Sequence, residues 1–248
     1  MDLNSDLAEG GEHDRELLAI VTSANVACGF HAGSPELMRT IVREARARGV
    51  AIGAHPGYHD REGFGRRELG HSPERIERDT TSQLKTLEAI CAEEGAVVEY
   101  VKPHGALYNR CVQDAVAARA VISAVRKVLP NAAILALADS RLLHDARRAG
   151  MQAFSEAFAD RGYSASGELL PRSAPGALIS DPVEAAARAL DIALSHRLQA
   201  ADGSTVNVDA HSICVHGDTP GALEIASRIR SVLANAGLTP APFVQARG

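Results

Sequence analysis

The chain has 248 residues, of which 46% are hydrophobic and 23% are charged. This composition is typical of a globular protein and excludes a largely disordered chain. The net charge of −5 gives no reason to expect nucleic acid as a partner. The length fits a single α/β barrel domain, which we expect to span residues 1–248.

The N-terminal segment is acidic and does not place a basic start before a long apolar stretch, so we do not expect a signal peptide. No apolar run is long enough to cross a bilayer. The four cysteines, Cys28, Cys91, Cys111 and Cys214, are widely spaced and form no CxxC pair, which indicates reduced thiols. We therefore expect a cytoplasmic protein that does not bind membranes.

Short β-rich runs alternate with longer segments of helical periodicity along the chain. We expect strands at residues 1–3, 22–28, 50–54, 97–101, 132–137, 152–157 and 212–215. Between them, apolar residues three or four positions apart predict amphipathic helices. This alternation indicates a parallel sheet, and a seven-stranded parallel (β/α) barrel in one domain fits the length best.

The starts and ends of the helices are marked by capping residues. Four start signals place an N-cap residue before proline: Ser34-Pro35, Ser72-Pro73, Asp181-Pro182 and Thr219-Pro220. Gly49, Gly95 and Gly150 stand where helices should end. Residues 161–180 show little periodicity, and loops of this length in a compact domain are usually functional.

Polar and ionisable side chains follow the predicted strands at the points where the strands end. They are Asp6 and Glu9, Asn25 and His31, His55, Lys102 and His104, Glu156 and Arg161, and His216 and Asp218. Because the carboxyl ends of parallel barrel strands converge on one face, we expect these side chains to form a polar pocket. Arg66, in the loop after the third strand, is a candidate for holding a carboxylate or phosphate.

The residues alone leave the chemistry of this pocket open. Asp6 with His31, His55 and His104 would make a zinc-like ligand set, but no HxH, HExxH or CxxC spacing supports it. The histidines also suit turn or core positions, and Asp6 suits hydrogen bonding to backbone amides. The GxSxG and GxxxxGK[ST] motifs are absent, so use of ATP would need another site or another subunit.

Six blocks of sequence together resemble the LamB/YcsF family, whose members include the A component of bacterial ATP-dependent 5-oxoprolinase. They are DLNSDLAEG at 2–10, TSANVACGFHAGSP at 22–35, IGAHPGYHDREGFGRR at 52–67, VKPHGALYN at 101–109, SEAFADRGY at 155–163 and ICVHGDTPGALEIA at 213–226. The resemblance covers nearly the whole chain. The segment between Glu9 and Leu17 is shorter than is usual in the family, and Ser34 stands where aspartate commonly precedes proline.

The resemblance implies a seven-stranded β/α barrel related to polysaccharide deacetylases. It also implies opening of the lactam of 5-oxo-L-proline to L-glutamate, with ATP as cosubstrate and with partner subunits B and C. The catalytic residues would then be Asp6, Glu9, His31, His55, Lys102 and His104. The substrate-binding residues would be Asn25, Arg66, Glu156, Arg161, His216 and Asp218. Two alternatives are a stand-alone metal-dependent deacetylase or amidase, and a non-catalytic regulatory subunit.

Overall fold

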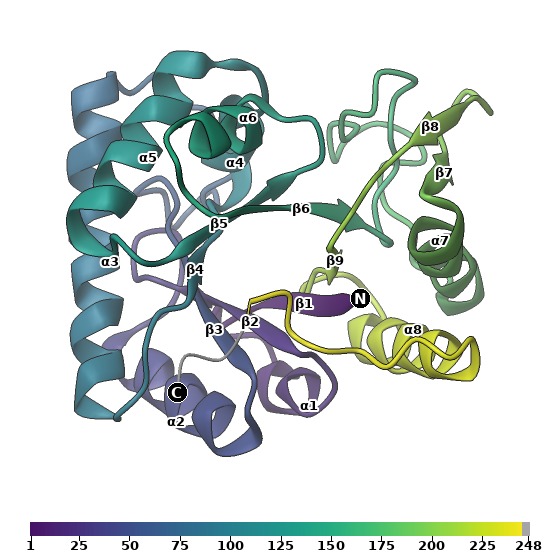
Figure 1. The fold of residues 1–248 in the computed structure, drawn as a ribbon, viewed down its shortest axis with the longest axis horizontal. Coiled ribbons are helices and arrows are strands. Elements are labelled where there is room, and N and C mark those ends of the chain that lie inside the picture. The colour runs from purple at the N-terminus through teal and green to yellow at the C-terminus, as the bar shows by residue number, and fades with distance from the viewer. Residues whose placement is uncertain (245–248) are drawn as a thin grey trace.

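The computed structural model describes residues 1–244, which form a closed barrel of parallel strands with helices outside it (Figure 1). The barrel strands are β1 (Asp2–Leu7), β2 (Ser23–Ala27), β3 (Ala51–His55), β4 (Tyr100–Val101), β5 (Ala133–Leu137), β6 (Ala153–Phe158) and β9 (Ser212–Val215). Each strand pairs with the next, and β9 closes the ring by pairing with both β6 and β1. The predicted seven-stranded parallel barrel is confirmed.

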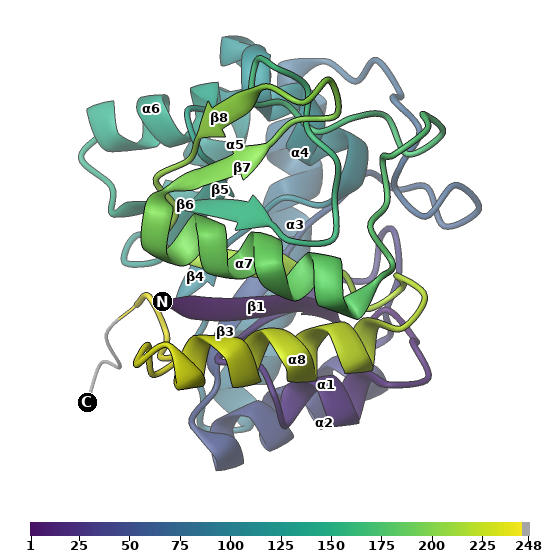
Figure 2. The same cartoon turned by 90° about the vertical axis from the view of Figure 1, so that its right-hand side faces the viewer.

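Helices cover the outer wall of the barrel (Figure 2). They are α1 (Asp14–Leu18), α2 (Pro35–Arg48), α3 (Pro73–Glu93), α4 (Gly105–Gln113), α5 (Ala115–Val128), α6 (Arg141–Arg148), α7 (Pro182–Ser195) and α8 (Ala222–Asn235). Their apolar faces pack against the outward-facing side chains of the strands in one continuous core. Within residues 1–244, no helix is both long and apolar enough to span a membrane.

Three of the four predicted helix starts are confirmed. Ser34, Ser72 and Asp181 cap α2, α3 and α7, each accepting a hydrogen bond from a backbone N–H of the first turn. The fourth prediction is wrong, because α8 begins after Gly221. Thr219 does not cap it, since its hydroxyl donates 2.7 Å to buried Asp160. The hydroxyl group that the sequence pattern predicted as a helix cap makes a tertiary hydrogen bond instead.

Three features of the strands differ from the prediction. The first strand, expected at 1–3, runs from Asp2 to Leu7, so Asp6 lies within β1 and does not follow it. The predicted strand at 97–101 shortens to Tyr100–Val101. A small antiparallel hairpin of β7 (Arg197–Gln199) and β8 (Thr205–Asn207), outside the barrel, was not predicted. Its strands have three residues each, which is too short for a period-two pattern to be recognised. Its turn contains Asp202-Gly203, a common hairpin signal that the sequence did offer.

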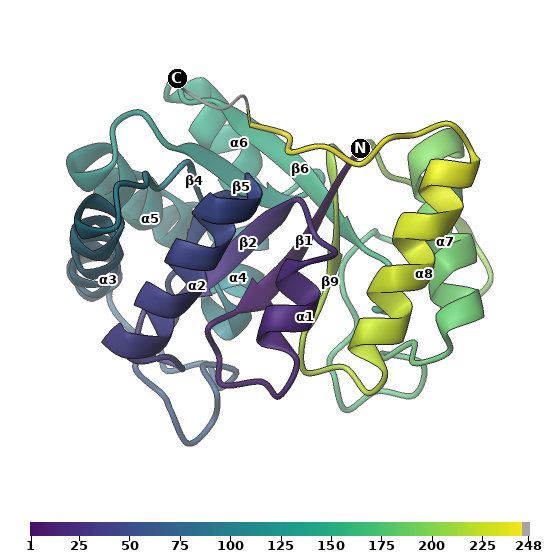
Figure 3. The same ribbon diagram turned by 90° about the horizontal axis from the view of Figure 1, so that it is seen from below.

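The inside of the barrel is polar, which is unusual for a buried space. Side chains alternate along β1, so Leu3 joins the outer apolar core while Asn4 and Asp6 contact groups on other strands across the interior. Near the end where the strands begin, aromatic side chains lie beside the polar ones. There Tyr100 and Phe154 contact Phe243 of the C-terminal segment, which crosses this end of the barrel (Figure 3).

Asp2 lies at this same end and should make stability depend on pH. Thr22, Ser23 and Ser212 donate to its carboxylate, but burial outweighs these bonds and raises its pKa from 3.8 to about 6. The protonated form is therefore favoured in the folded state. Its contribution is complete below pH 3.8 and is lost as the pH rises through 6.

The variant Asp2→Asn removes this titration. We expect its free energy of unfolding, relative to wild type, to rise by roughly 2 kcal/mol between pH 4 and pH 7. Urea denaturation of both proteins at several pH values measures the difference. Asp191→Asn, at an exposed position of α7, is the matched control and should show no such trend. Parallel pH curves for wild type and Asp2→Asn would contradict the prediction.

Candidate functional site

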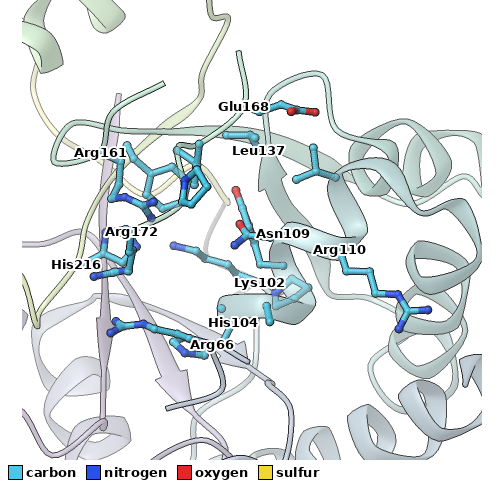
Figure 4. Close-up of a pocket in the computed structure, with 18 of the residues that line it drawn as sticks. Arg66, Lys102, His104, Asn109, Arg110, Leu137, Arg161, Glu168, Arg172 and His216 are labelled. Carbon is cyan, nitrogen blue, oxygen red and sulfur yellow. The ribbon is translucent and has the colours of Figure 1, made fainter. Parts of the chain in front are cut away.

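A pocket of about 660 Å³ opens where the barrel strands end, as predicted (Figure 4). Seven of the predicted site residues line it: Asp6, His55, Arg66, Lys102, His104, Arg161 and His216. The long loop after β6, which the sequence analysis singled out, contributes Glu168, Leu169, Leu170, Pro171 and Arg172 to the wall of this pocket. The volume of the pocket is in the range of small-molecule sites.

Lys102 follows β4 and forms the floor of the pocket. Its Nζ lies 3.3 Å from Asp6 Oδ1, 3.0 Å from Glu156 Oε2, 3.2 Å from Asn4 Oδ1 and 3.1 Å from Cys214 Sγ. Burial alone would lower the pKa of Lys102, but the neighbouring negative charges, Asp6 foremost, raise it well above its ordinary value. The floor therefore carries a fixed ammonium group, held by four partners.

Asp6 connects this ammonium group to the histidines. Its Oδ1 accepts a hydrogen bond from Asn25 Nδ2 at 2.8 Å and lies 3.4 Å from His55 Nε2. Burial would raise the pKa of Asp6, but the interactions of its carboxylate with His55 and Lys102 outweigh burial and hold the pKa well below its ordinary value. Asp6 is thus an ionised carboxylate that orients its neighbours, not the backbone cap considered for it.

His31, His55 and His104 come together beside Asp6, although they follow three different strands. His31 and His104 stack with ring centroids 3.8 Å apart, and Glu9 Oε1 lies 3.0 Å from His31 Nε2. Glu9 and the three histidines each offer one ligand atom, and these four atoms all lie within 4.8 Å of one another. The site can therefore bring four donors to one cation.

Backbone carbonyls fix the ring orientation of two of these histidines. His55 Nδ1 lies 2.7 Å from Lys102 O, and His104 Nε2 lies 2.8 Å from Phe64 O, so each nitrogen donates to its carbonyl. The remaining nitrogens, His55 Nε2 and His104 Nδ1, then face each other with lone pairs at 3.0 Å. Two lone pairs at this distance require a shared proton or a metal ion.

The loop after β3 makes the bond to His104 possible. Gly65 has a φ of +65°, and a Cβ there would lie 2.7 Å from His31 Cβ and 2.9 Å from His104 Cδ2. Only glycine combines this backbone conformation with so close an approach. The glycine therefore lets the Phe64 carbonyl reach the imidazole.

These residues fit a divalent metal ion. Burial, followed by the neighbouring imidazoles, lowers the pKa of His31 and His104 well below the ordinary value, which keeps them neutral as metal ligands must be. A ligand histidine usually donates its other nitrogen to a carbonyl or carboxylate, as His55 and His104 do. The predicted ligand set changes in one member, because Glu9 joins the histidines while Asp6 binds Lys102 and Asn25.

Arg66, Arg161 and Arg172 gather on one side of the pocket mouth, whereas Arg110 lies on the other (Figure 4). Asp218 lies between two of them, 2.5 Å from Arg66 Nη2 and 3.6 Å from Arg172 Nη2. Arg161 instead donates to the carbonyls of Ala177 and Leu170, so it holds the loop after β6 in place. Arg66 and Arg172 are therefore the side chains best placed to exchange Asp218 for an anionic ligand.

The other predicted residues lie deeper than the pocket surface. Asn25 bonds with Asn4, Asp6 and the Tyr100 hydroxyl, and fully buried Glu156 lies beneath Lys102. Both support the floor and do not line the pocket. Sequence reasoning did not single out Asn4, Tyr108 or Asp160. An oxygen of Asp160 lies 3.0 Å from His216 Nδ1. Asn4 could have been predicted to face the barrel interior, because it stands two residues before Asp6 on the same strand.

Comparison with known proteins identifies the family. The model of the LamB/YcsF family matches residues 1–248. A crystal structure of the lactam utilization protein from Thermus thermophilus is 43% identical in sequence, with a TM-score of 0.90 over 97% of this chain and 98% of that one. The chain belongs to the LamB/YcsF family. The resemblance carried by the six sequence blocks is thus confirmed.

More distant structures share only the fold with this family member. A protein from Enterococcus faecalis V583 is 12% identical, with a TM-score of 0.57 over 98% of this chain and 96% of that one. The T48 deacetylase, solved with its substrate, is 15% identical, with a TM-score of 0.50 over 97% of this chain and 87% of that one. The expected likeness to deacetylase barrels is confirmed at the level of the fold.

Proposed function

We propose that this chain is the A component of an ATP-dependent 5-oxoprolinase, which opens the lactam of 5-oxo-L-proline to L-glutamate together with partner subunits B and C. Its family and its similarity to a lactam utilization protein support this function. The observation that carries the proposal is the pairing of a buried ammonium group, Lys102, with two arginines at the mouth of the same pocket. A lactam with a carboxylate needs both kinds of group.

The carboxylate of the substrate would bind at the mouth and its ring would point toward the floor. Arg66 or Arg172 would exchange Asp218 for the substrate carboxylate, since a guanidinium group binds either through two hydrogen bonds. The lactam oxygen would then approach Lys102, which stabilises the negative charge that develops on it. An unactivated lactam is a poor electrophile, so we assign to subunits B and C the transfer of the γ-phosphoryl group of ATP to the amide oxygen. A second water releases this group as inorganic phosphate once the ring has opened.

Ring opening needs a proton to move from water to nitrogen. A water oxygen forms a bond to the lactam carbonyl carbon, the carbon–nitrogen bond breaks, and the nitrogen becomes the amino group of glutamate. His55 Nε2 and His104 Nδ1 can hold one proton between them at 3.0 Å. This pair would accept the proton of water and return it to the departing nitrogen. Asp6 and Glu156 keep Lys102 charged and in place throughout.

Glutamate formation from 5-oxoproline and ATP tests the proposal directly. The assay compares this chain alone, subunits B and C alone, and all three proteins together. We expect glutamate only from the complete mixture, with ATP consumed alongside it. Equal glutamate formation with and without this chain would refute its assignment as the A component.

Arg66 should determine the affinity for the substrate carboxylate. We expect Arg66→Ala to raise KM for 5-oxoproline in the complete mixture about 10- to 100-fold, because a charged hydrogen-bond partner is lost. KM for 2-pyrrolidinone, which has the lactam but no carboxylate, should stay unchanged. Steady-state kinetics with both lactams measures this difference. An equal rise for both would place Arg66 in a role other than carboxylate recognition.

The facing lone pairs of His55 and His104 favour a second candidate, a metal-dependent amidase or deacetylase that acts without partners. Glu9, His31, His55 and His104 would hold the metal ion. A bound divalent metal ion supplies Lewis-acid activation of water or of an amide carbonyl. Metal analysis of the purified chain, combined with hydrolysis assays on amides and acetylated sugars without ATP, tests this candidate. Stoichiometric zinc or manganese with partner-free turnover would favour it over the oxoprolinase.

A further inference from the structure

Helices α5 and α6 lie side by side on the outer wall of the barrel and carry an unusual concentration of positive charge (Figure 1). In α5 there is no acidic residue, and α6 has only Asp145. Together the two helices have six basic side chains: Arg119, Arg126, Lys127, Arg141, Arg147 and Arg148. The pair thus has a net charge of +5 in a chain whose net charge is −5.

A groove of about 750 Å³ runs along this pair of helices. Its apolar lining comes from Ile122 and Ala149, and basic side chains line most of the rest. Arg141 is neutralised in part by Asp145, whose Oδ2 lies 3.0 Å from Arg141 Nε. Three further basic side chains are exposed and make no hydrogen bond or ion pair within residues 1–244: Arg126, Lys127 and Arg148.

Compensation of the helix dipole is only part of the reason why basic residues stand at these three positions. They lie in the last turns of α5 and α6, where a basic side chain offsets the helix dipole. Basic side chains of α2 have acidic partners nearby, since Arg39 and Arg43 pair with Glu93 and Glu94. In the α5–α6 groove, residues 1–244 supply no such partners for these three side chains.

We propose that the α5–α6 groove docks an acidic amphipathic helix of the B or C subunit, an inference that rests on the proposed function for the identity of the partner. An apolar floor between basic rims matches a helix with an apolar face and acidic flanks. No aromatic side chain is among the described residues that line the groove, so none can stack on a base, which argues against a nucleotide or nucleic acid.

The location of the groove suits a subunit interface. None of its lining residues also lines the pocket at the barrel mouth, so a docked helix leaves the active site open to substrate. Arg141, at the first residue of α6, lies at the groove end nearest that mouth, while Arg148 lies at the far end of the helix. A partner held along α5 and α6 therefore sits beside the pocket and does not cover it.

Charge reversal in the groove tests the proposal. The variant R126E/K127E/R148E is compared with wild type for binding to the purified B and C subunits, by isothermal titration calorimetry at low and high salt. A matched control, R48E/K85E/R228E, reverses one lysine and two arginines at exposed positions on α2, α3 and α8. Circular dichroism and thermal unfolding establish that both variants are folded.

We expect the groove variant to bind about 30-fold or more weakly, the control to bind within a few-fold of wild type, and wild-type affinity to fall as salt rises. Unchanged affinity of the groove variant would overturn the docking site, and so would a wild-type chain that binds neither subunit. The proposed function has a separate readout, because it fails when the wild-type mixture forms no glutamate, whatever the binding data show. Loss of binding by groove and control variants alike would assign the effect to overall charge and overturn the site.

Discussion

Replacing Lys102 by methionine will reduce kcat/KM for 5-oxoproline in the complete mixture by about 10²- to 10³-fold, the usual effect of removing a group that stabilises developing negative charge. It will also destabilise the fold. Asp6 and Glu156 are almost fully buried and would lose the cation that lies 3.3 and 3.0 Å from them. Breaking such a pair from one side costs about 3–5 kcal/mol of stability.

A double variant separates the two effects of this substitution. Lys102→Met combined with Glu156→Gln removes one positive and one negative charge, so we expect most of the lost stability to return while activity stays low. Urea denaturation and steady-state kinetics on both variants measure this. Lys85→Met, at an exposed position of α3, is the surface control. Wild-type turnover in the folded double variant would remove Lys102 from the reaction.

His104→Gln should reduce kcat by about 10²- to 10⁴-fold, the range for loss of a proton-transferring group. The substitution removes the Nδ1 lone pair that faces His55 and the Nε2 bond to the Phe64 carbonyl. Because the same lone pair is a candidate metal ligand, metal content should be measured on the same samples. His59→Gln, an exposed position outside the cluster, is the control and should retain wild-type turnover.

The metal measurement decides what the histidine pair does. If wild-type protein binds no metal and His104→Gln still loses turnover, the pair acts by proton transfer. If wild-type protein binds one equivalent of metal and the variant loses both metal and turnover, the second candidate function is favoured. Full activity of His104→Gln would contradict both roles for His104.

The barrel was predictable because several of its units carry the same local signals. A buried β-rich run, a capped helix start such as Ser34-Pro35 and a glycine after the helix, as at Gly49, recur in order. The hairpin of β7 and β8 was missed because its strands are too short to carry a pattern, although Asp202-Gly203 signals its turn. The true start of α8 was not predictable, because Thr219 is used by Asp160, 59 residues away in sequence. Local signals cannot report a partner so distant in the chain.

It was easier to predict which residues form the site than to predict the role of each one. Strand ends converge in any parallel barrel, so placing Asp6, Lys102 and His104 together required only the topology. Sequence could not tell that Asp6 binds the lysine while Glu9 joins the histidines, since both were expected to follow the first strand and both are carboxylates, whereas Asp6 lies within β1 and only Glu9 follows it. The difference arises from side-chain direction, which depends on where β1 ends and the loop turns away.

Tyr100, Phe154 and Phe243 pack together at the end of the barrel where its strands begin, whereas the pocket opens at the carboxyl ends of the strands. Because these aromatic side chains occupy the opposite end, a reactant and its product would both pass through the pocket mouth. Turnover would then depend on product release and substrate binding at the pocket mouth as well as on the bond-breaking step. Accumulated product would compete directly with incoming substrate, so the barrel itself links the rate of catalysis to the removal of what it makes.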